Sequence, residues 1–409
     1  MVQSLKYCIK SKLFWIYVLL AFAAFSKQLI KESLLLDSLE YLKKSQNLLN
    51  NWHAENVPQE RYLEPFRRTI GYPFILKVLN NTHFLVYVFQ LIVSLFIPIL
   101  LHQLSKKHAF FSTQWNWMML SMLTYPLQFF YTSFLMPEIL VQACLLLMIV
   151  FYFEGQRRWV PFILTVLVLL KPVFVIFLII PLVLAILNHY QLSVYDLLPI
   201  TVIFIVSVMH YKQYGVFEYS SVGYTNAYDY NRKKFLIQKI GETNTEFLYN
   251  EENSVLMTHA KEDGYLVHFF KEKTTPILLD PIYWQIHLKG FIVTFLDPGR
   301  YDAMVFLNWE KTSGFMGLND GNAIIDRPWY QWLYITIFAI FAVAKLMFAL
   351  FAVFHWRKHS VFVMLAILAL ILAFMAGPVG SARYLMPVYP LMSILSAIGL
   401  LTVKNQFLR

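Results

Sequence analysis

The chain has 409 residues, of which 58% are hydrophobic and 14% charged, and its formal net charge is +10. Many apolar runs approach the roughly 20 residues that one helix needs to cross a bilayer, which argues against a soluble protein and predicts an all-α polytopic membrane protein. The only cysteines are Cys8 and Cys144, so no disulfide framework is possible. The sequence contains no P-loop, HExxH, Rossmann or paired-cysteine motif, so it gives no support to an ATP-driven pump or a zinc protease.

The hydrophobic runs predict about ten transmembrane helices. The first run follows three lysines, as a signal peptide would, but its A-x-A triplet lies inside the apolar stretch, so we expect a retained span, with cleavage as the alternative. The fifth and sixth runs are short and leave a re-entrant pair open. In chain order the predicted spans are Leu13–Phe25, Phe84–Leu104, Ala109–Phe134, Ile139–Phe153, Trp159–Leu170, Val173–Leu187, Leu197–Tyr211, Trp329–Phe354, Val361–Ala376 and Tyr384–Val403.

The basic residues are distributed unevenly between the two sides of the predicted membrane. If the N-terminus is cytoplasmic, the inner segments hold eleven Lys and Arg residues against only Glu154 and Asp196. The charges left on the outer side nearly balance, so the positive-inside rule explains the net charge and nucleic acid is not a predicted partner. We therefore expect a multi-pass protein of the bacterial inner-membrane type with both termini in the cytoplasm.

Three parts follow from this topology. Residues 1–211 form an N-terminal transmembrane part with an external loop at 26–83, residues 212–328 an external loop domain, and residues 329–409 the C-terminal transmembrane helices. The external domain has charge clusters that are typical of solvated helices and ends in an apolar run between Pro281 and Pro298. Because Trp284, His287 and Lys289 interrupt its aliphatic residues, residues 281–297 are predicted to form a helix in the membrane interface.

Charged residues recur where the predicted spans meet the outer side. Ionisable groups at this depth are costly unless they are paired or used, so they are functional-site candidates by default. They come from four separate outer connections, and in chain order they are Asp37, Arg68, Glu138, Lys171 and Arg383.

Each candidate also has an alternative without function. Asp37 could pair with Lys43 or Lys44 on an exposed helix. Glu138 follows Pro137 at the start of a helix, where the helix dipole alone stabilises a carboxylate. The cations at the ends of spans could extend to lipid headgroups.

The spacing of these residues matches a set of family motifs. Around the first outer loop, Asp37–Tyr41 read D-S-L-E-Y and Arg68–Pro73 read R-T-I-G-Y-P. The chain thereby resembles the GT-C superfamily of glycosyltransferases that use polyprenyl-phosphate sugars, particularly the branch with protein O-mannosyltransferases and lipid A aminoarabinose transferases, in which D-x-x-x-Y precedes R-x-P-G-Y-P. The family has three further motifs. Glu138 matches the acidic residue that opens the fourth span, and Leu170–Pro172 match the T-K/R-P-like turn. Arg383–Pro390 match the late R-Y-x-x-P-x-x-P segment.

Two departures from the family pattern are visible. Ile70 stands where proline is usual before Gly71, and the acidic pair is separated as Asp37 and Glu40 instead of adjacent. These departures weaken an assignment to protein mannosylation. The resemblance covers the membrane half of the chain and not the external loop domain.

The resemblance implies a GT-C-like helical bundle that transfers a sugar with inversion on the outer face of the membrane. An acceptor hydroxyl that attacks a sugar carbon needs a base, for which Asp37 is the candidate. A departing lipid phosphate needs fixed cations, for which Arg68, Lys171 and Arg383 are the candidates. The expected partners are a polyprenyl-phosphate-linked donor, a lipid, glycan or protein acceptor, and membrane lipids.

The remaining candidates have supporting roles. Glu138 and Glu40 could orient a cation or hold the acceptor, and Tyr41 and Tyr72 could stack on the sugar, although anchoring of these rings in the membrane interface is the expectation we favour. No cofactor is predicted, because the chain has no D-x-D triplet for a nucleotide-bound metal. A divalent metal held by the carboxylates stays open.

A lipid or glycolipid transporter is the main rival, and an assembly subunit without chemistry is a third reading. A transporter should have polar residues at the bilayer midplane, broken helices and related halves. Here the charges cluster on one face and Lys345 alone lies deep, where packing or an internal ion pair would explain it.

Overall fold

The computed structural model describes residues 2–48, 68–107, 114–186, 192–214, 217–259, 265–309, 328–355, 360–379 and 381–407, and all regular elements in these ranges are helical. The predicted class, a helical membrane protein, is confirmed at this level. Part of the first outer loop, the beginning of the third apolar run and residues 310–327 fall outside these ranges.

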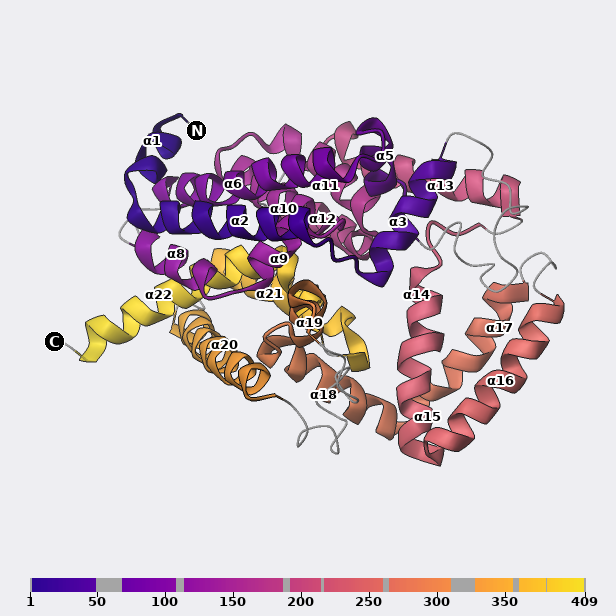
Figure 1. The fold of residues 1–409 in the computed structure, drawn as a ribbon. Coiled ribbons are helices and arrows are strands. Elements are labelled where there is room, and N and C mark those ends of the chain that lie inside the picture. The colour runs from indigo at the N-terminus through magenta and orange to yellow at the C-terminus, as the bar shows by residue number, and fades with distance from the viewer. Residues whose placement is uncertain are drawn as a thin grey trace.

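The N-terminal part folds into a layer of packed helices in the upper half of Figure 1. Within this layer α10 packs on α6 and on α11, and α2 packs on α6 and α9. The elements are α1 (Val2–Lys10), α2 (Lys12–Ile30), α3 (Leu36–Asn47), α5 (Gly71–Val78), α6 (His83–Lys107), α8 (Trp115–Leu123), α9 (Leu127–Ser133), α10 (Glu138–Phe153), η3 (Arg157–Trp159), α11 (Val160–Leu170), η4 (Pro172–Leu178), α12 (Ile179–Ile186), η5 (Val194–Leu197) and α13 (Leu198–Tyr214).

The second half of the chain forms the lower part of Figure 1, where α14 to α17 lie on one side and α20 to α22 on the other. Helix α20 packs along α22, and α18 packs on α20 and α21. The elements are α14 (Val222–Thr225), η6 (Asn226–Arg232), α15 (Lys233–Ile240), α16 (Glu242–His259), α17 (Tyr265–Thr274), η7 (Thr275–Leu279), α18 (Pro281–Leu296), α19 (Arg300–Leu307), α20 (Trp329–His355), α21 (Ser360–Met375), η9 (Gly377–Val379), η10 (Ala382–Tyr384), η11 (Met386–Val388) and α22 (Tyr389–Phe407).

Five helices in the described ranges are long and apolar enough to cross a membrane, and a sixth span is possible if the bent pair α9 and α10 counts as one. The five correspond to the first, second, seventh, eighth and tenth predicted runs. The other runs are also helical but shorter or broken, and the sixth divides into η4 and the short α12. About ten complete crossings therefore remain a prediction.

A sharp break separates α9 from α10. The two helices are bent by 113° over the residues between Ser133 and Glu138, and Pro137 precedes α10 as its N-cap. Proline is unfavourable within a helix but suits its first turn, which explains why the helix stops and restarts here. The break places Glu138 at the beginning of a helix, where the helix dipole favours a carboxylate.

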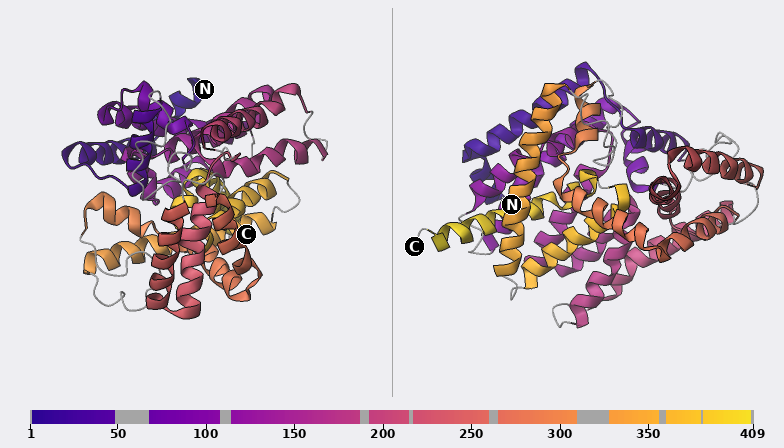
Figure 2. Two further views of the ribbon diagram at one scale, coloured as in Figure 1. Left: turned by 90° about the vertical axis from the view of Figure 1, so that its right-hand side faces the viewer. Right: turned by 90° about the horizontal axis from the view of Figure 1, so that it is seen from below.

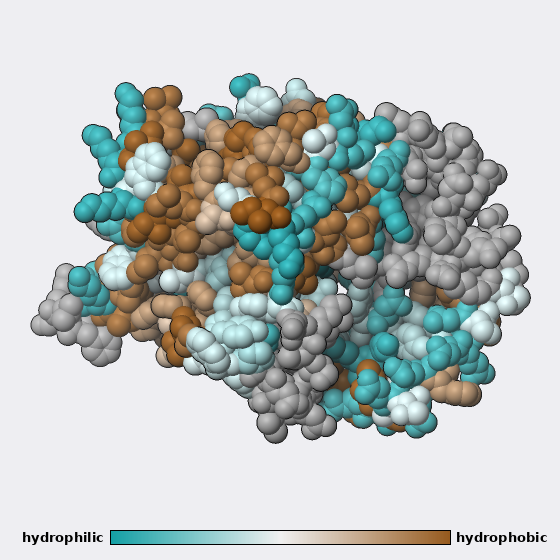
Figure 3. Space-filling model, in the orientation of Figure 1, coloured by the Kyte–Doolittle hydropathy of each residue, from teal (hydrophilic) through white to brown (hydrophobic). Residues whose placement is uncertain are grey.

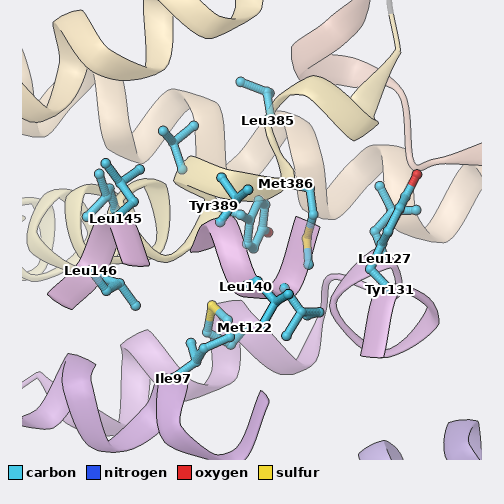
Figure 4. Packing of buried hydrophobic residues seen from close by; sticks show 14 of the residues in the cluster. Ile97, Met122, Leu127, Tyr131, Leu140, Leu145, Leu146, Leu385, Met386 and Tyr389 are labelled. Carbon is cyan, nitrogen blue, oxygen red and sulfur yellow. The ribbon is translucent and has the colours of Figure 1, made fainter. Parts of the chain in front are cut away.

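One large apolar core joins the two halves. Figure 4 shows part of it, where Leu140 and Met122 from the N-terminal half approach Met386 and Tyr389 from the C-terminal half. Side chains from α6, α8, α10 and α22 are almost fully buried in this cluster. Residues far apart in the sequence are thus held in fixed positions relative to one another.

Helices α14 to α17, which lie in the predicted external domain, have a small core of their own. Tyr228, Tyr249, Phe269 and Phe270 pack together, and Arg232 forms a bidentate pair with Glu252 at 2.7 and 2.8 Å. Figure 2 shows these helices projecting from the remainder of the molecule. In Figure 3 hydrophilic residues gather over α15 to α17, whereas hydrophobic residues cover much of the upper half. The predicted helix at 281–297 is present as α18 (Pro281–Leu296), and its place in the membrane interface remains a prediction.

Gly71 lets α5 approach α11 closely. A Cβ atom added at this position would lie 2.6 Å from the backbone oxygen of Leu169, which cannot move independently of its helix. We expect Gly71→Ala to lower the free energy of unfolding by about 1–3 kcal/mol, visible as a lower melting temperature in detergent micelles. Gly223→Ala is the matched control, because a Cβ there meets nothing within 4 Å. Equal melting temperatures for both variants would contradict this expectation.

Candidate functional site

The first part of the site is an ion-pair group at the beginning of α3. Asp37 lies in the first turn of this helix, and Glu40 follows one turn later. Arg68, on the far side of the loop, donates from Nη2 to Asp37 Oδ1 and from Nε to Glu40 Oε2, each at 2.6 Å. One guanidinium therefore links Arg68 to both carboxylates of α3, as arginine can bind two acceptors at once.

Arg383 connects this group to the broken span. Its Nη2 lies 2.9 Å from Asp37 Oδ2, and its Nε lies 3.9 Å from Glu138 Oε1. Glu138 also accepts a hydrogen bond of 2.8 Å from Lys171 Nζ. The predicted residues Asp37, Arg68, Glu138, Lys171 and Arg383, together with Glu40, thus form one continuous network, which we call the charge network.

The charge network is largely withdrawn from solvent. Glu138 is fully buried, whereas the side chains of Lys171 and Arg383 keep 16% and 24% of their surface exposed. Its three carboxylates balance its three cations, which is needed because an unpaired charge is costly to bury. The two partly exposed cations are the members that an incoming anion would meet first.

Local structure explains how the two later cations are placed. Lys171 is the C-cap of α11 and has an extended backbone, with φ of −146° and ψ of 128°. Arg383 lies in the short turn η10. The side chain of Ser381, the N-cap of this turn, accepts a hydrogen bond from the backbone N–H of Arg383. Extension of these cations to lipid headgroups was the alternative. Both instead point into the charge network.

Tyr41 and Tyr72 pack behind the charge network. Their rings meet edge to face with centroids 5.0 Å apart, and the Arg68 guanidinium lies over the Tyr41 ring. The Tyr72 hydroxyl donates to Gln90 Oε1 at 3.1 Å. Tyr41 lies on α3 and Tyr72 on α5, and both rings are buried in the protein interior, so this structure does not bear out the favoured expectation of anchoring in the membrane interface.

Lys44 supports the loop from α3. Its ammonium donates to the backbone oxygen of Arg68. Burial, and secondly the charge of Arg68, lower the pKa of Lys44 to about 7. The alternative in which Lys44 holds Asp37 on an exposed helix does not describe this arrangement, because Asp37 is buried and pairs with two arginines.

Two acidic residues that were not predicted lie beside the network. Asp297 accepts a hydrogen bond from the backbone N–H of Ala382, next to Arg383, at 3.3 Å. Asp302 on α19 accepts one from the Tyr131 hydroxyl at 2.7 Å and is only 2% exposed. Both come from the segment after α18, where the sequence contains charged residues throughout. No local signal separates these two from solvated ones.

Lys345 lies apart from the charge network. Its ammonium donates to the backbone oxygen of Thr124 at 2.9 Å and to the Tyr389 hydroxyl. The rings of Tyr125 and Tyr389 stack with centroids 3.4 Å apart, and the ammonium lies near both. Of the two explanations predicted for Lys345, packing describes this contact set.

Among the residues that the structure describes, no group of three or more His, Cys, Asp or Glu side chains is arranged to hold a metal ion. In the charge network a cation stands between each neighbouring pair of carboxylates, as with Arg383 between Asp37 and Glu138.

Comparison with known proteins gave no relatives: no protein-family model, no curated protein and no solved structure matches the chain. The family resemblance therefore rests on the motifs alone.

Proposed function

We propose that this protein is an integral membrane glycosyltransferase that moves a sugar from a polyprenyl-phosphate-linked donor to an acceptor hydroxyl or phosphate. The observation that carries the proposal is the charge network, in which residues from four separate segments meet at hydrogen-bond or ion-pair distances. Removing six charged groups from water in a largely apolar protein costs desolvation free energy. Binding of a charged substrate would explain why the protein keeps them there.

The donor's phosphate fits the more exposed side of the network. Arg383 and Lys171 are the exposed cations there, and a phosphate would take over Arg383 from Asp37. Because the described charges of the network already balance, a singly charged phosphodiester suits it better than a doubly charged diphosphate. The same cations would stabilise the phosphate as its negative charge grows during departure.

Asp37 is the proposed base. Between two arginines a carboxylate is a weak base, because the cations stabilise its charged form. Once a phosphate has taken Arg383, Asp37 loses one of the two arginines that neutralise it in the described residues, and loss of a neighbouring cation makes a carboxylate more basic. It then accepts the proton of the acceptor hydroxyl while the acceptor oxygen bonds to the anomeric carbon and the bond to the phosphate oxygen breaks. We propose inversion at that carbon, as in the resembled family.

The location proposed for the reaction is the outer face of the bacterial inner membrane. It rests on the excess of basic residues in the terminal and connecting segments that the sequence predicts to face the cytoplasm. Both termini are then cytoplasmic.

Lipid or glycolipid transport is the second candidate. The broken helix of α9 and α10, bent by 113°, favours it, because discontinuous helices are frequent in transporters. The two functions differ in product: a transferase joins sugar to acceptor, whereas a transporter moves an unchanged lipid between leaflets.

The deciding experiment uses the purified full-length protein in lipid nanodiscs with a labelled polyprenyl-phosphate sugar and an envelope lipid extract as acceptor. The proposal expects the label to move to an acceptor that mass analysis identifies, and expects no transfer from a nucleotide sugar. Transfer from the nucleotide sugar would refute the donor class. Movement of intact donor across vesicle membranes without transfer would favour the transporter.

A further inference from the structure

Asp302 is the carboxylate near the charge network that takes part in no ion pair. Within the residues that the structure describes, no cationic nitrogen lies within 4 Å of its oxygens. In the described part of the chain its one side-chain hydrogen-bond partner is Tyr131, whose hydroxyl lies 2.7 Å from Asp302 Oδ1. In Figure 4 this hydroxyl points away from the other labelled apolar side chains. A buried acid with one neutral hydrogen bond has an unusual environment, because buried carboxylates normally have a cation beside them.

The position of Asp302 is fixed by close packing. Gly299 begins α19 with a left-handed backbone, φ 77°, and a Cβ there would lie 2.4 Å from the side chain of Leu127. Further along α19, the Phe306 ring stacks on Phe130 with centroids 4.5 Å apart. The helix is therefore held against α9 from both ends.

The charged groups around Asp302 come from several elements. Burial raises its pKa to about 7, the charge of Arg383 and the hydrogen bond from Tyr131 lower it, and the charges of Asp297 and Glu138 raise it. Among these groups Arg383 is the cation, its charge lowers the pKa of Asp302, and the same Arg383 pairs with Asp37 at 2.9 Å. Near neutral pH, Asp302 changes between a neutral acid and a carboxylate.

We propose that Asp302 controls the phosphate site through its proton: as a neutral acid it leaves Arg383 to the donor's phosphate, and as a carboxylate it opposes that phosphate. The inference rests on the proposed function, because it requires the charge network to bind a phosphate. It adds that donor binding takes up a proton near neutral pH and weakens as the pH rises.

The test measures binding of a polyprenyl methyl phosphodiester to the full-length protein in nanodiscs. This probe carries one negative charge at any pH near neutrality, so its own titration does not contribute. For the wild type we expect affinity about three- to tenfold lower at about pH 8 than at about pH 6. In Asp302→Asn, which keeps an acceptor for Tyr131, affinity should stay at its low-pH value throughout.

Two further variants sharpen the test. Tyr131→Phe removes a hydrogen bond that favours the charged form, so the pKa of Asp302 rises and the pH at which affinity falls should move upwards. Glu272→Gln is the matched control, because this exposed carboxylate loses the same charge away from the network and should leave the pH dependence unchanged.

The outcomes separate this inference from the proposed function. Binding without pH dependence in the wild type, or unchanged pH dependence in Asp302→Asn, overturns the role of Asp302 alone. Absence of binding at every pH overturns the phosphate site and the inference together. Proton uptake on binding, measured by calorimetry in buffers of different ionisation enthalpy, should be present in the wild type and absent in Asp302→Asn.

Discussion

Replacing Asp37 by asparagine is expected to reduce sugar transfer by about 10²- to 10⁴-fold, the usual contribution of a general base. Asparagine has nearly the same shape but cannot accept the acceptor's proton. Donor binding should persist or become tighter, because Arg68 and Arg383 lose the carboxylate that now neutralises them. Turnover with a labelled donor, and binding of a polyprenyl phosphodiester, measure the two effects separately.

Glu40→Gln is the matched comparison for that variant. Glu40 pairs with Arg68 at the same distance as Asp37 does, but no contact to Arg383 is found for it in the described residues. We expect a clearly smaller loss of transfer. Equal losses in the two variants would mean that both carboxylates serve to hold Arg68, and unchanged transfer in Asp37→Asn would refute its role as base.

Glu138→Ala is expected to lower the free energy of unfolding by about 3–5 kcal/mol, because it leaves the partly buried cations Lys171 and Arg383 without their shared, fully buried carboxylate. Lys171 loses its partner at 2.8 Å, and Arg383 loses the one at 3.9 Å. Unfolding in detergent micelles, followed at one scan rate, provides the measurement.

The pH dependence of this loss has a definite sign. Burial lowers the pKa of Lys171, and Glu138 raises it. Without Glu138 the folded-state pKa of Lys171 is lowered further, so the loss of stability grows as the pH falls below the unfolded pKa of this lysine. The deficit of Glu138→Ala should therefore be larger at low pH and shrink as the pH rises. If the loss of stability in Glu138→Ala did not depend on pH, it would not come from the protonation of Lys171.

The double variant Glu138→Leu with Lys171→Met separates stability from function. Replacing a buried ion pair by apolar residues of similar size is often neutral or stabilising. We expect the double variant to recover most of the stability that Glu138→Ala loses and to remain inactive in transfer. Recovery of both stability and transfer would show that the pair is structural.

The charges at the ends of spans could be found because apolar runs have a fixed minimum length and charged residues interrupt them visibly. The structure brings all five of these residues into one network. Their chemical roles, and the sidedness of the membrane, remain predictions.

The residues that could not be found depend on contacts between distant segments. Asp302 is buried because α19 packs on α9, about 170 positions earlier in the chain. Tyr72 faces the interior because Gly71 allows α5 to touch α11. The local pattern of hydrophobic and polar residues predicts neither the burial of Asp302 nor that of Tyr72.

The sequence by itself determined the class of the protein, a helical membrane protein, because span length and hydrophobicity are local properties that a bilayer enforces on each segment separately. It also marked the charged positions that require an explanation. Tertiary structure alone decided which charges pair, since pairing depends on helix breaks such as the 113° bend before Glu138 and on packing between the two halves. Electrostatic energy falls steeply with distance in a medium that water penetrates, so a few ångströms set by packing separate a buried pair from a solvated charge.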